Sequence, residues 1–371
     1  MPFIVGSRIA LHADGLHPRQ EWSSRGGGAL SVRNGAQYLD LIRPGEAQVI
    51  VSDGRAIASR SIQVLPPPRS DEALLMVACF DDGVAIYDAS SLRFKGLLAT
   101  GGSPSDIAQS AGEAIVTDND GSALTRIERS PWKVSRIAIP LTDEVAADAR
   151  GHFFATIREW HERGAVARIA ARSKVATTGI TAEGVAVDAP RHILYVANIN
   201  DGSIVALDSR TLAVRDRIAV GERVYSLALS PDGRRLYATR NGGLSNDYGE
   251  VIALKTRPRL RVLARSTPLT LPLGVALDST ADRLFVTDEE LNRVDVLDPR
   301  TLRPSHPPLQ TCRTPWKPHY DARSDRLFIP CAQANEVDIF NATTLKRAPG
   351  APLHTAGYPL AVAISRSVRP R

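Results

Sequence analysis

The chain has 371 residues, of which 43% are hydrophobic and 23% charged, and its formal net charge is +6. This composition allows a large core and excludes global disorder. The longest strictly apolar run, 73–80, is far shorter than the roughly 20 residues that cross a bilayer, so we expect no transmembrane segment. Three cysteines without a C-x-x-C pair exclude a disulfide scaffold and the usual zinc, redox and haem motifs.

Residues 1–65 predict a small unit of short strands. We expect strands at 7–11, 22–24, 29–32, 48–51 and 61–64, with turns at 34–35, 44–45 and 53–54. The phrases Trp22-Ser23-Ser24, Asn34-Gly35 and Pro-Gly-x-Ala-x-Val-x-Val from Pro44 resemble a bacterial Ig-like domain of group 2. The resemblance implies a small Ig-like β-sandwich without that family's first strand, and therefore a longer precursor. Residues 66–70 are proline-rich and predict a stiff, extended linker.

A repeated phrase fills the chain from about residue 74 to 365. Leu194-Tyr195-Val196-Ala197-Asn198 returns as Leu284-Phe285-Val286-Thr287-Asp288, and related phrases begin at 75, 114, 153, 236 and 327. The starts lie 39 to 48 residues apart, and each unit contains four short strands. Such a period is typical of a β-propeller blade, so seven starts predict an all-β, seven-bladed propeller over residues 71–366.

The phase of the repeat predicts how the ring closes. In each unit an inner strand such as 184–188 precedes the quoted phrase, and the last inner strand is 358–365. Only a basic tail, 367–371, follows it, whereas the first unit begins at Leu74 without an inner strand. We therefore expect the C-terminal strand to complete the first blade, so that neither strand leaves a free edge.

The repeated phrases resemble the YVTN family of β-propeller repeats, over about Leu74 to Ser365. The family is seven-bladed and common in bacterial and archaeal secreted or surface proteins. The resemblance implies a secreted or periplasmic protein, although no signal peptide is visible at the N-terminus. It also implies a binding scaffold more often than an enzyme, and it does not define a ligand.

Candidate ligand-binding residues lie where second strands end and inner strands begin. No G-x-S-x-G, H-E-x-x-H or P-loop motif occurs, so we name no catalytic residue. In a propeller both kinds of position are expected near the axis, where convergent polar groups form a small-ligand site; the alternative is a solvated funnel. The candidates are Asp118, Glu144, Glu183, Asn198, Tyr225, Arg240, Asp288 and Trp316.

Two functions follow from this pattern. The first is a binding or interaction module whose partner is a protein, a glycan or a small molecule. The second is a lactonase-like hydrolase or isomerase, which similar propellers host, with an axial divalent cation such as Ca²⁺. Its ligands would be Asp118, Glu144, Glu183, Asn198 and Asp288. Arg240 argues against it because it would repel a cation. Nucleic acid is not expected, because the alternating arginines at 257, 259 and 261 have no interleaved aromatic residues.

The cysteines allow one disulfide. Cys79 and Cys331 occupy equivalent positions in neighbouring blades, which are usually farther apart than the roughly 7 Å between Cα atoms that a bridge permits. Counting along the hairpin that turns at 322–325 places Cys331 opposite Trp316, so the loop at Cys312 could fold back onto Cys331 in an oxidising compartment. We therefore expect Cys312–Cys331 as the only bridge, with Cys79 buried; the alternative is three free thiols.

Overall fold

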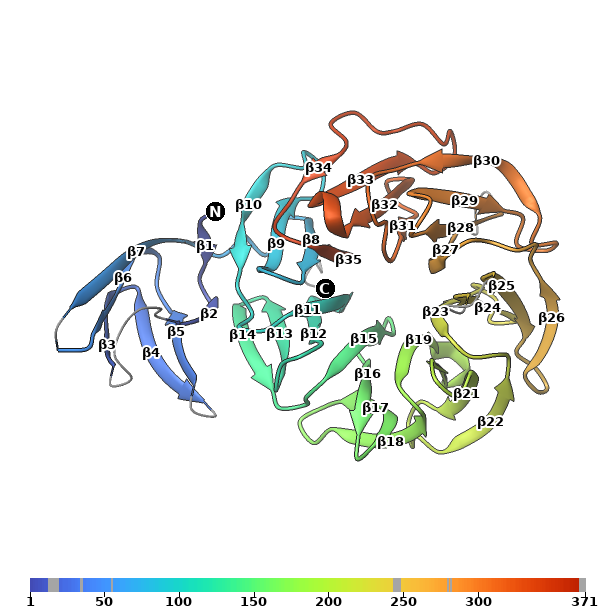
Figure 1. The fold of residues 1–371 in the computed structure, drawn as a ribbon, viewed down its shortest axis with the longest axis horizontal. Helices are drawn as coiled ribbons and strands as arrows, with labels where there is room; N and C mark the ends of the chain where they lie inside the picture. The colour runs from blue at the N-terminus through green and yellow to red at the C-terminus, as the bar shows by residue number, and fades with distance from the viewer. Residues whose placement is uncertain are drawn as a thin grey trace.

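The computed structural model describes residues 1–12, 20–33, 36–54, 56–242, 248–278, 280 and 282–366. Strands dominate these residues, beside two short 3-10 helices, η1 (Ala189–Arg191) and η2 (Ala332–Ala334). The all-β expectation is confirmed, whereas the turn at 34–35 and the tail at 367–371 lie outside the described residues. Figure 1 shows a leading part beside a ring of sheets. In the described residues no helix is long and apolar enough to cross a membrane.

The ring consists of repeated four-stranded antiparallel sheets, as in a β-propeller, and we number the sheets in chain order. The first is β35 (Pro359–Ser365), β8 (Leu74–Cys79), β9 (Gly83–Asp88) and β10 (Phe94–Leu98). The second is β11 (Pro104–Ser110), β12 (Glu113–Asp118), β13 (Leu124–Arg129) and β14 (Trp132–Ile137). The third is β15 (Thr142–Ala147), β16 (Phe153–Trp160), β17 (Arg163–Ile169) and β18 (Lys174–Gly179).

The other sheets repeat this order, with the innermost strand first. The fourth is β19 (Ala182–Asp188), β20 (Ile193–Asn198), β21 (Ser203–Asp208) and β22 (Val214–Ala219). The fifth is β23 (Val224–Leu229), β24 (Arg235–Arg240), β25 (Glu250–Lys255) and β26 (Arg261–Arg265). The sixth is β27 (Pro272–Asp278), β28 (Arg283–Asp288), β29 (Arg293–Leu297) and β30 (Pro304–Gln310). The seventh is β31 (His319–Asp321), β32 (Arg326–Cys331), β33 (Glu336–Asn341) and β34 (Leu353–His354).

The second strand of each sheet is apolar on both faces because both faces are covered. In the fourth sheet, Leu194 and Val196 pack against Phe154 of the third sheet. Tyr195 and Ala197, which point the other way, belong to a cluster with residues of the fifth sheet. Alternate side chains of the strand therefore pack against two different neighbouring sheets. Because both faces are covered, the repeated phrase is a continuous apolar run.

A repeated threonine ties each of several sheets to the next. Thr239 Oγ1 donates to the carbonyl of Leu273 at 2.6 Å and accepts the N–H of Ser226 at 3.1 Å. It thus joins the inner strands of the fifth and sixth sheets. Thr117, Thr156 and Thr287 donate in the same way to Asp143, Glu183 and Trp316. These buried bonds hold the inner strands in register around the axis.

Replacing Thr239 should show what one such bond contributes. In a Thr239→Val protein the Ser226 N–H and the Leu273 carbonyl lose their partner inside the core. We expect a loss of about 1–3 kcal/mol in the free energy of unfolding, measured by urea denaturation. Thr267→Val is the matched control, because Thr267 is exposed, and it should change the value by less than about 0.5 kcal/mol. Equal effects of the two substitutions would contradict the assignment.

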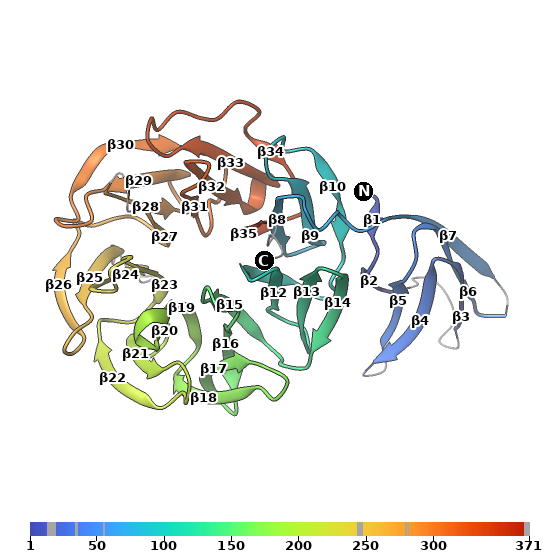
Figure 2. The same cartoon turned by 180° about the vertical axis from the view of Figure 1, so that it is seen from behind.

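The end of the chain pairs with the beginning of the ring, as the sequence predicted. β35 is antiparallel to β8, with Val362 opposite Val77, and all seven of its residues are buried. The two strands lie side by side in both views (Figures 1 and 2). Buried Arg129 of the second sheet donates to the Ser365 carbonyl at 3.2 Å and to Ser365 Oγ at 3.0 Å. The last strand is therefore held by both its own sheet and the next one.

The described residues of the leading part form seven strands in two sheets. They are β1 (Phe3–Ile4), β2 (Arg8–Ala10), β3 (Glu21–Gly26), β4 (Gly28–Arg33), β5 (Ala36–Leu41), β6 (Gly45–Ser52) and β7 (Ile57–Leu65). One sheet has the order β2-β5-β4, and β3-β6-β7-β1 continues into β10 of the first ring sheet. The sequence analysis missed β1 and β5.

Strand β1 joins the leading part to the ring by hydrogen bonds. It is parallel to β7 on one side and to β10 on the other. Ile4 is fully buried in the cluster of the first and second ring sheets, and Trp132 Nε1 of β14 donates to the Val5 carbonyl at 2.9 Å. The leading part is thus attached to the ring by this strand as well as by the proline-rich segment after β7.

The structure contains the predicted Cys312–Cys331 disulfide. The Cα atoms are 5.6 Å apart and the cysteines are separated by 19 residues. The sequence analysis placed Trp316 opposite Cys331, whereas Pro315 is its partner, a difference of one residue. Cys79 is free and buried, and its burial raises the pKa of the thiol to about 12.

Thiol counting and reduction test the bridge. Under denaturing, non-reducing conditions we expect one reactive thiol per chain. Because the bridge closes a loop of about 20 residues, its reduction should lower the free energy of unfolding by about 3 kcal/mol. The Cys312→Ala/Cys331→Ala protein should have the same melting temperature with and without reductant. Three reactive thiols in the unreduced protein would rule the bridge out.

Candidate functional site

A polar cluster lies where inner strands of several sheets begin, around the axis of the ring. The inner strands β11, β15, β19, β23, β27, β31 and β35 surround the centre in Figure 1. We call the polar cluster at their beginning the axial cluster. Its members are Asp106, Asp143, Glu144, Arg158, Glu183, Tyr225 and Lys317.

Lys317 joins two acidic side chains from different sheets. Its Nζ lies 2.7 Å from Asp106 Oδ2 and 3.0 Å from Glu144 Oε2. The exposed fractions of the Lys317, Asp106 and Glu144 side chains are 26%, 5% and 12%. Burial opposes the charge of Lys317, but the two carboxylates outweigh it and raise the pKa of the lysine above its ordinary value. Burial also raises the pKa of Glu144 to about 7, against the opposing effect of Lys317.

The same carboxylates bind the backbone of the next sheet. Asp106 Oδ2 accepts the N–H of Val145 at 2.9 Å, and Glu144 Oε2 accepts the N–H of Val185 at 3.2 Å. Asp106 begins the inner strand of the second sheet, Val145 lies in the third and Val185 in the fourth. The two carboxylates therefore hold neighbouring sheets together in addition to balancing the charge of Lys317. This half of the axial cluster is structural.

Asp143 and Glu183 form the other half of the axial cluster. Asp143 is 6% exposed. Burial, and then the charge of Asp143, raises the pKa of Glu183 well above its usual value. Asp143 Oδ2 and Glu183 Oε2 are both buried and receive no hydrogen bond from the described residues. Arg158 Nε is 3.4 Å from Asp143 Oδ2, an ion pair at the long end of the hydrogen-bond range.

Tyr225 faces the Asp143–Glu183 pair from the fifth sheet. Its phenol is half-buried, and burial raises its pKa, while charges on Arg223, Glu183 and Arg158 also act on it. Buried Arg223 Nε has no hydrogen-bond partner among the described residues. Two carboxyl groups, a phenol and two guanidinium groups therefore lie around one mouth, and together they can donate and accept hydrogen bonds.

Only part of the predicted site lies in this mouth. Glu144, Glu183 and Tyr225 do. Trp316 lies beside the mouth, where its backbone carbonyl accepts a hydrogen bond from Thr287 Oγ1. Asn198 is fully buried and hydrogen-bonded to Ser203 of its own sheet and to Thr178 of the third sheet. Arg240 Nε pairs with Glu250 at 2.7 Å. Buried Asp288 accepts the N–H groups of Thr270 and Leu291 in its own turns.

Strand alternation explains why Asp118, Asn198, Arg240 and Asp288 do not converge on the axis. In three of these strands the preceding residue is the threonine that faces the next sheet, and in the fourth it is the equivalent Ala197. The following side chain must point to the opposite face, toward the turn of its own sheet. Asp118 accordingly accepts the N–H of Ser103 at 2.8 Å. The sequence analysis read the strand end correctly but not the direction of the side chain.

The residues that were not predicted sit next to predicted ones. Asp143 precedes Glu144, and Lys317 follows Trp316. The available signal was a lysine at the start of one inner strand where Asp106 and Glu144 occupy the equivalent place in two others. Such a pattern of opposite charges around a ring predicts an ion-pair network.

The described residues do not fit an axial divalent cation. Among them, no group of three or more His, Cys, Asp or Glu side chains is placed to hold a metal ion. The Lys317 ammonium already lies between Asp106 and Glu144, while Asn198 and Asp288 are engaged elsewhere. The protein therefore supplies its own cation at the place where the sequence analysis put a metal.

Comparisons with known proteins find similarity in fold. No protein-family model matches the chain, and no curated protein does. A periplasmic gluconolactonase of Pseudomonas aeruginosa matches with a TM-score of 0.65 and 13% identity, over 80% of this chain and 99% of that one. Hydrazine synthase of Kuenenia stuttgartiensis matches with a TM-score of 0.65 and 15% identity, over 76% of this chain and 94% of that one. Sqt1 of Saccharomyces cerevisiae matches with a TM-score of 0.56 and 15% identity, over 78% of this chain and 87% of that one.

These similarities establish a β-propeller fold and no activity. The matched proteins differ in function by their own names, and all three are far below the identity at which function transfers. The function of this chain must therefore be argued from its own axial cluster.

Proposed function

We propose that this protein is a secreted or periplasmic binding module that holds a small polar ligand at the axial mouth of a seven-bladed propeller. Residues 71–366 form the propeller, of the YVTN type, and residues 1–65 form an Ig-like spacer. The four-stranded sheets and the pairing of β35 with β8 support the propeller assignment. The Cys312–Cys331 bridge favours an oxidising compartment, as does the similarity to a periplasmic protein.

The observation that carries the proposal is the pair of buried oxygens on Asp143 and Glu183. Buried polar atoms are normally hydrogen-bonded. Here the Glu183 and Asp143 side chains interact with each other, and Arg158 Nε reaches Asp143 Oδ2 only at 3.4 Å, so the buried pair keeps hydrogen-bonding capacity that a ligand could use. A ligand hydroxyl could donate to Asp143 and exchange a hydrogen bond with Glu183, while Tyr225 and Arg158 bind its other oxygens. We therefore expect a neutral or weakly anionic molecule rich in hydroxyl groups.

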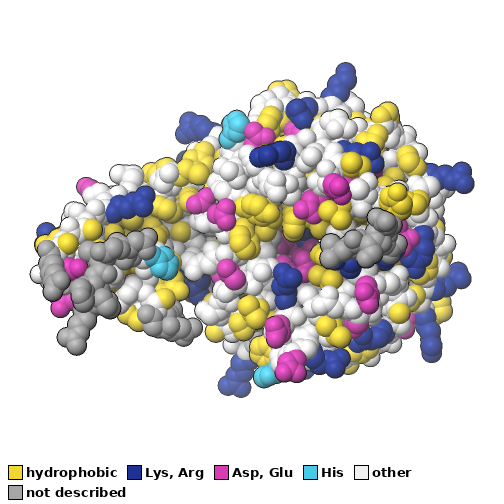
Figure 3. Space-filling model, viewed as in Figure 1, with side chains coloured by type: hydrophobic (Ala, Val, Ile, Leu, Met, Phe, Trp, Pro, Cys, Tyr) yellow, Lys and Arg dark blue, Asp and Glu magenta, His cyan; other side chains and the backbone are white. Residues whose placement is uncertain are grey.

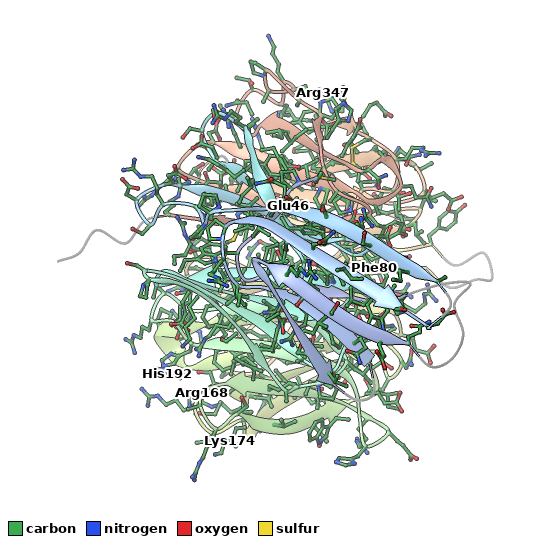
Figure 4. The ribbon with its side chains drawn as sticks, turned by 90° about the vertical axis from the view of Figure 1, so that its left-hand side faces the viewer. Glu46, Phe80, Arg168, Lys174, His192 and Arg347 are labelled. Atoms are coloured by element: carbon green, nitrogen blue, oxygen red, sulfur yellow. A yellow bond between two sulfur atoms is a disulfide. The ribbon has the colours of Figure 1, made fainter. Side chains whose placement is uncertain are left out.

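Calorimetry with a panel of sugars, sugar acids and polyols tests this proposal. Glu183→Gln and Asp143→Asn should each weaken the binding of the best ligand at least tenfold, because each changes one side of the hydrogen-bond pair. Glu46→Gln is the control, since Glu46 is exposed on the leading part, in front of the ring in Figure 4. Unchanged affinity in both axial variants would place the ligand elsewhere.

A lactonase-like hydrolase remains the second candidate, without an axial metal. Burial raises the pKa of Glu144 to about 7 and that of Glu183 further above its usual value. Carboxyl groups with such pKa values can act as general acids or bases near neutral pH. Proton release from glucono-δ-lactone, corrected for spontaneous hydrolysis, tests it. A hydrolase predicts an enzymatic rate that falls at least 100-fold in Glu183→Gln; a binding module predicts no rate above background.

A further inference from the structure

A second candidate site lies in a groove of about 1090 Å³ between the leading part and the ring. We call it the junction groove. One wall is β2, with Ile9 and Ala10, together with Tyr38 of β5. The other wall carries Asp81, Asp82, Asp118 and Asp120 at the turns of the first and second ring sheets. Acidic side chains border this junction in Figure 3.

The aspartates of the junction groove have no cationic partner. None of the four forms an ion pair with a described Lys, Arg or His, although the chain as a whole has a net charge of +6. The two arginines of the groove are already engaged. Arg8 pairs with Asp40 at 2.6 Å and covers the Tyr38 ring, and Arg136 donates to the Thr100 carbonyl at 3.2 Å. The ring wall therefore carries negative charge that the described residues leave uncompensated.

Asp118 is the most deeply placed of these groups, with 6% of its surface exposed. Its carboxylate lies against Gly102 and Gly121, and a Cβ at either glycine would overlap it. Burial raises its pKa to about 6, and the neighbouring charge of Asp120 contributes to the rise. Backbone hydrogen bonds, such as that from the Ser103 N–H at 2.8 Å, offset part of the cost of burying this carboxylate, and a cationic ligand would offset more of it.

On the opposite wall, β2 is the outer strand of its sheet, and among the described residues its outer edge has no strand partner at Ala10. Arg8 donates its N–H to the Ala99 carbonyl at 2.7 Å, on the side of β2 that faces away from β5. The N–H of Leu11 donates to the Gln37 carbonyl on the β5 side at 2.9 Å. Because the direction alternates along a strand, the N–H and carbonyl of Ala10 face away from β5, as those of Arg8 do. Residues 99–103 of the ring also line the groove.

We propose that the junction groove binds an extended, basic peptide segment of a partner protein. Its backbone adds to the free edge of β2 at Ala10, and its Lys or Arg side chains meet Asp118, Asp120, Asp81 and Asp82. Strand addition supplies affinity through main-chain hydrogen bonds, and alternate side chains supply selectivity. This site is independent of the axial mouth and goes beyond the function proposed for it.

Fluorescence anisotropy with labelled ten-residue peptides tests the charge requirement. An alternating Lys-Val peptide should bind, an alternating Glu-Val peptide should not, and added salt should weaken the binding. Asp118→Asn/Asp120→Asn should reduce the affinity at least tenfold. Asp232→Asn/Asp282→Asn removes the same charge at two exposed positions outside the groove and should change it less than twofold. Equal losses in both double variants would overturn the proposal.

Backbone pairing is tested separately. Ala10→Pro removes the N–H that faces the groove without removing a β2–β5 hydrogen bond, and should weaken the Lys-Val peptide at least tenfold; Ala10→Val should not. If Ala10→Pro does not fold, a Lys-Val peptide N-methylated at alternate residues answers the same question on the unmodified protein, and should bind at least tenfold more weakly.

The other outcomes are equally decisive. Full binding by the N-methylated peptide, or preference for neutral oligosaccharides over the Lys-Val peptide, would overturn the proposal, the latter in favour of a glycan site. Glu183→Gln should leave peptide binding unchanged, which keeps a failure here distinct from a failure of the axial site.

Discussion

A protein truncated after Gly357 should not yield a soluble, folded monomer. The truncation removes β35, whose seven residues are all buried. Ala361 and Ala363 pack between the first and second sheets, and Val362 and Ile364 pack against Phe328 of the seventh. Burial of Leu360, Val362 and Ile364 alone contributes roughly 5 kcal/mol or more, which is comparable with the whole stability of many domains.

The truncation also exposes strand edges. β8 loses its partner and presents unpaired N–H and carbonyl groups, which promote aggregation. Arg129 loses both Ser365 acceptors inside the protein. Size-exclusion chromatography with light scattering should show aggregates, whereas removal of 367–371 alone should leave a monomer with an unchanged melting temperature. A truncated protein that melts cooperatively as a monomer would refute the role given to β35.

Replacement of Lys317 by Met should destabilise the protein by about 3–5 kcal/mol at pH 8, because it leaves Asp106 and Glu144 buried without their cation. The loss should shrink at lower pH. Burial already raises the pKa of Glu144 to about 7 in the folded protein, and removal of the lysine raises it further. The folded state then binds more protons than the unfolded state above pH 4.5, so its stability falls as the pH rises through this range.

Urea denaturation of Lys317→Met at pH 5, 6.5 and 8 measures this effect. In the wild-type protein, deprotonation of Glu144 should lower the free energy of unfolding as the pH rises from about 4.5 to 7. In the variant the decrease should be larger and should extend to higher pH. Lys95→Met is the matched control, because Lys95 pairs with Glu72 at 3.1 Å with both side chains 24% exposed. It should cost about 1 kcal/mol or less. Similar losses at both lysines would refute the role assigned to Lys317.

The repeat made the ring largely predictable. The quoted phrases mark second strands because neighbouring sheets cover both of their faces, which leaves a continuous apolar run in the sequence. The position of the final inner strand followed from the phase of the repeat, and the Cys312–Cys331 bridge followed from counting back along one hairpin. These features depend on local patterns of burial and spacing, which the sequence states directly.

The candidate site was predictable only in part. Glu144, Glu183 and Tyr225 were identified because inner strands begin near the axis in any propeller. Asp118, Asn198 and Asp288 were grouped with them because each ends a strand, yet their side chains bind nearby turns and, for Asn198, also Thr178 of the neighbouring sheet. The direction of a side chain at a strand end depends on the hydrogen bonds of the following turn, which a repeat alignment does not contain.

By itself, then, the sequence determined the all-β class, the repeated four-stranded unit and the pairing of the last strand with the first ring sheet, and it named Cys312–Cys331 as the one candidate disulfide. The tertiary structure alone decided that Lys317 bridges Asp106 and Glu144, that β1 joins the leading part to the ring, and that Asp118 lies in the junction groove. The reason is physical. Burial patterns repeat along the chain and can be read from it. Charges that meet across different sheets leave no periodic signal in the sequence, and neither does a two-residue strand such as β1.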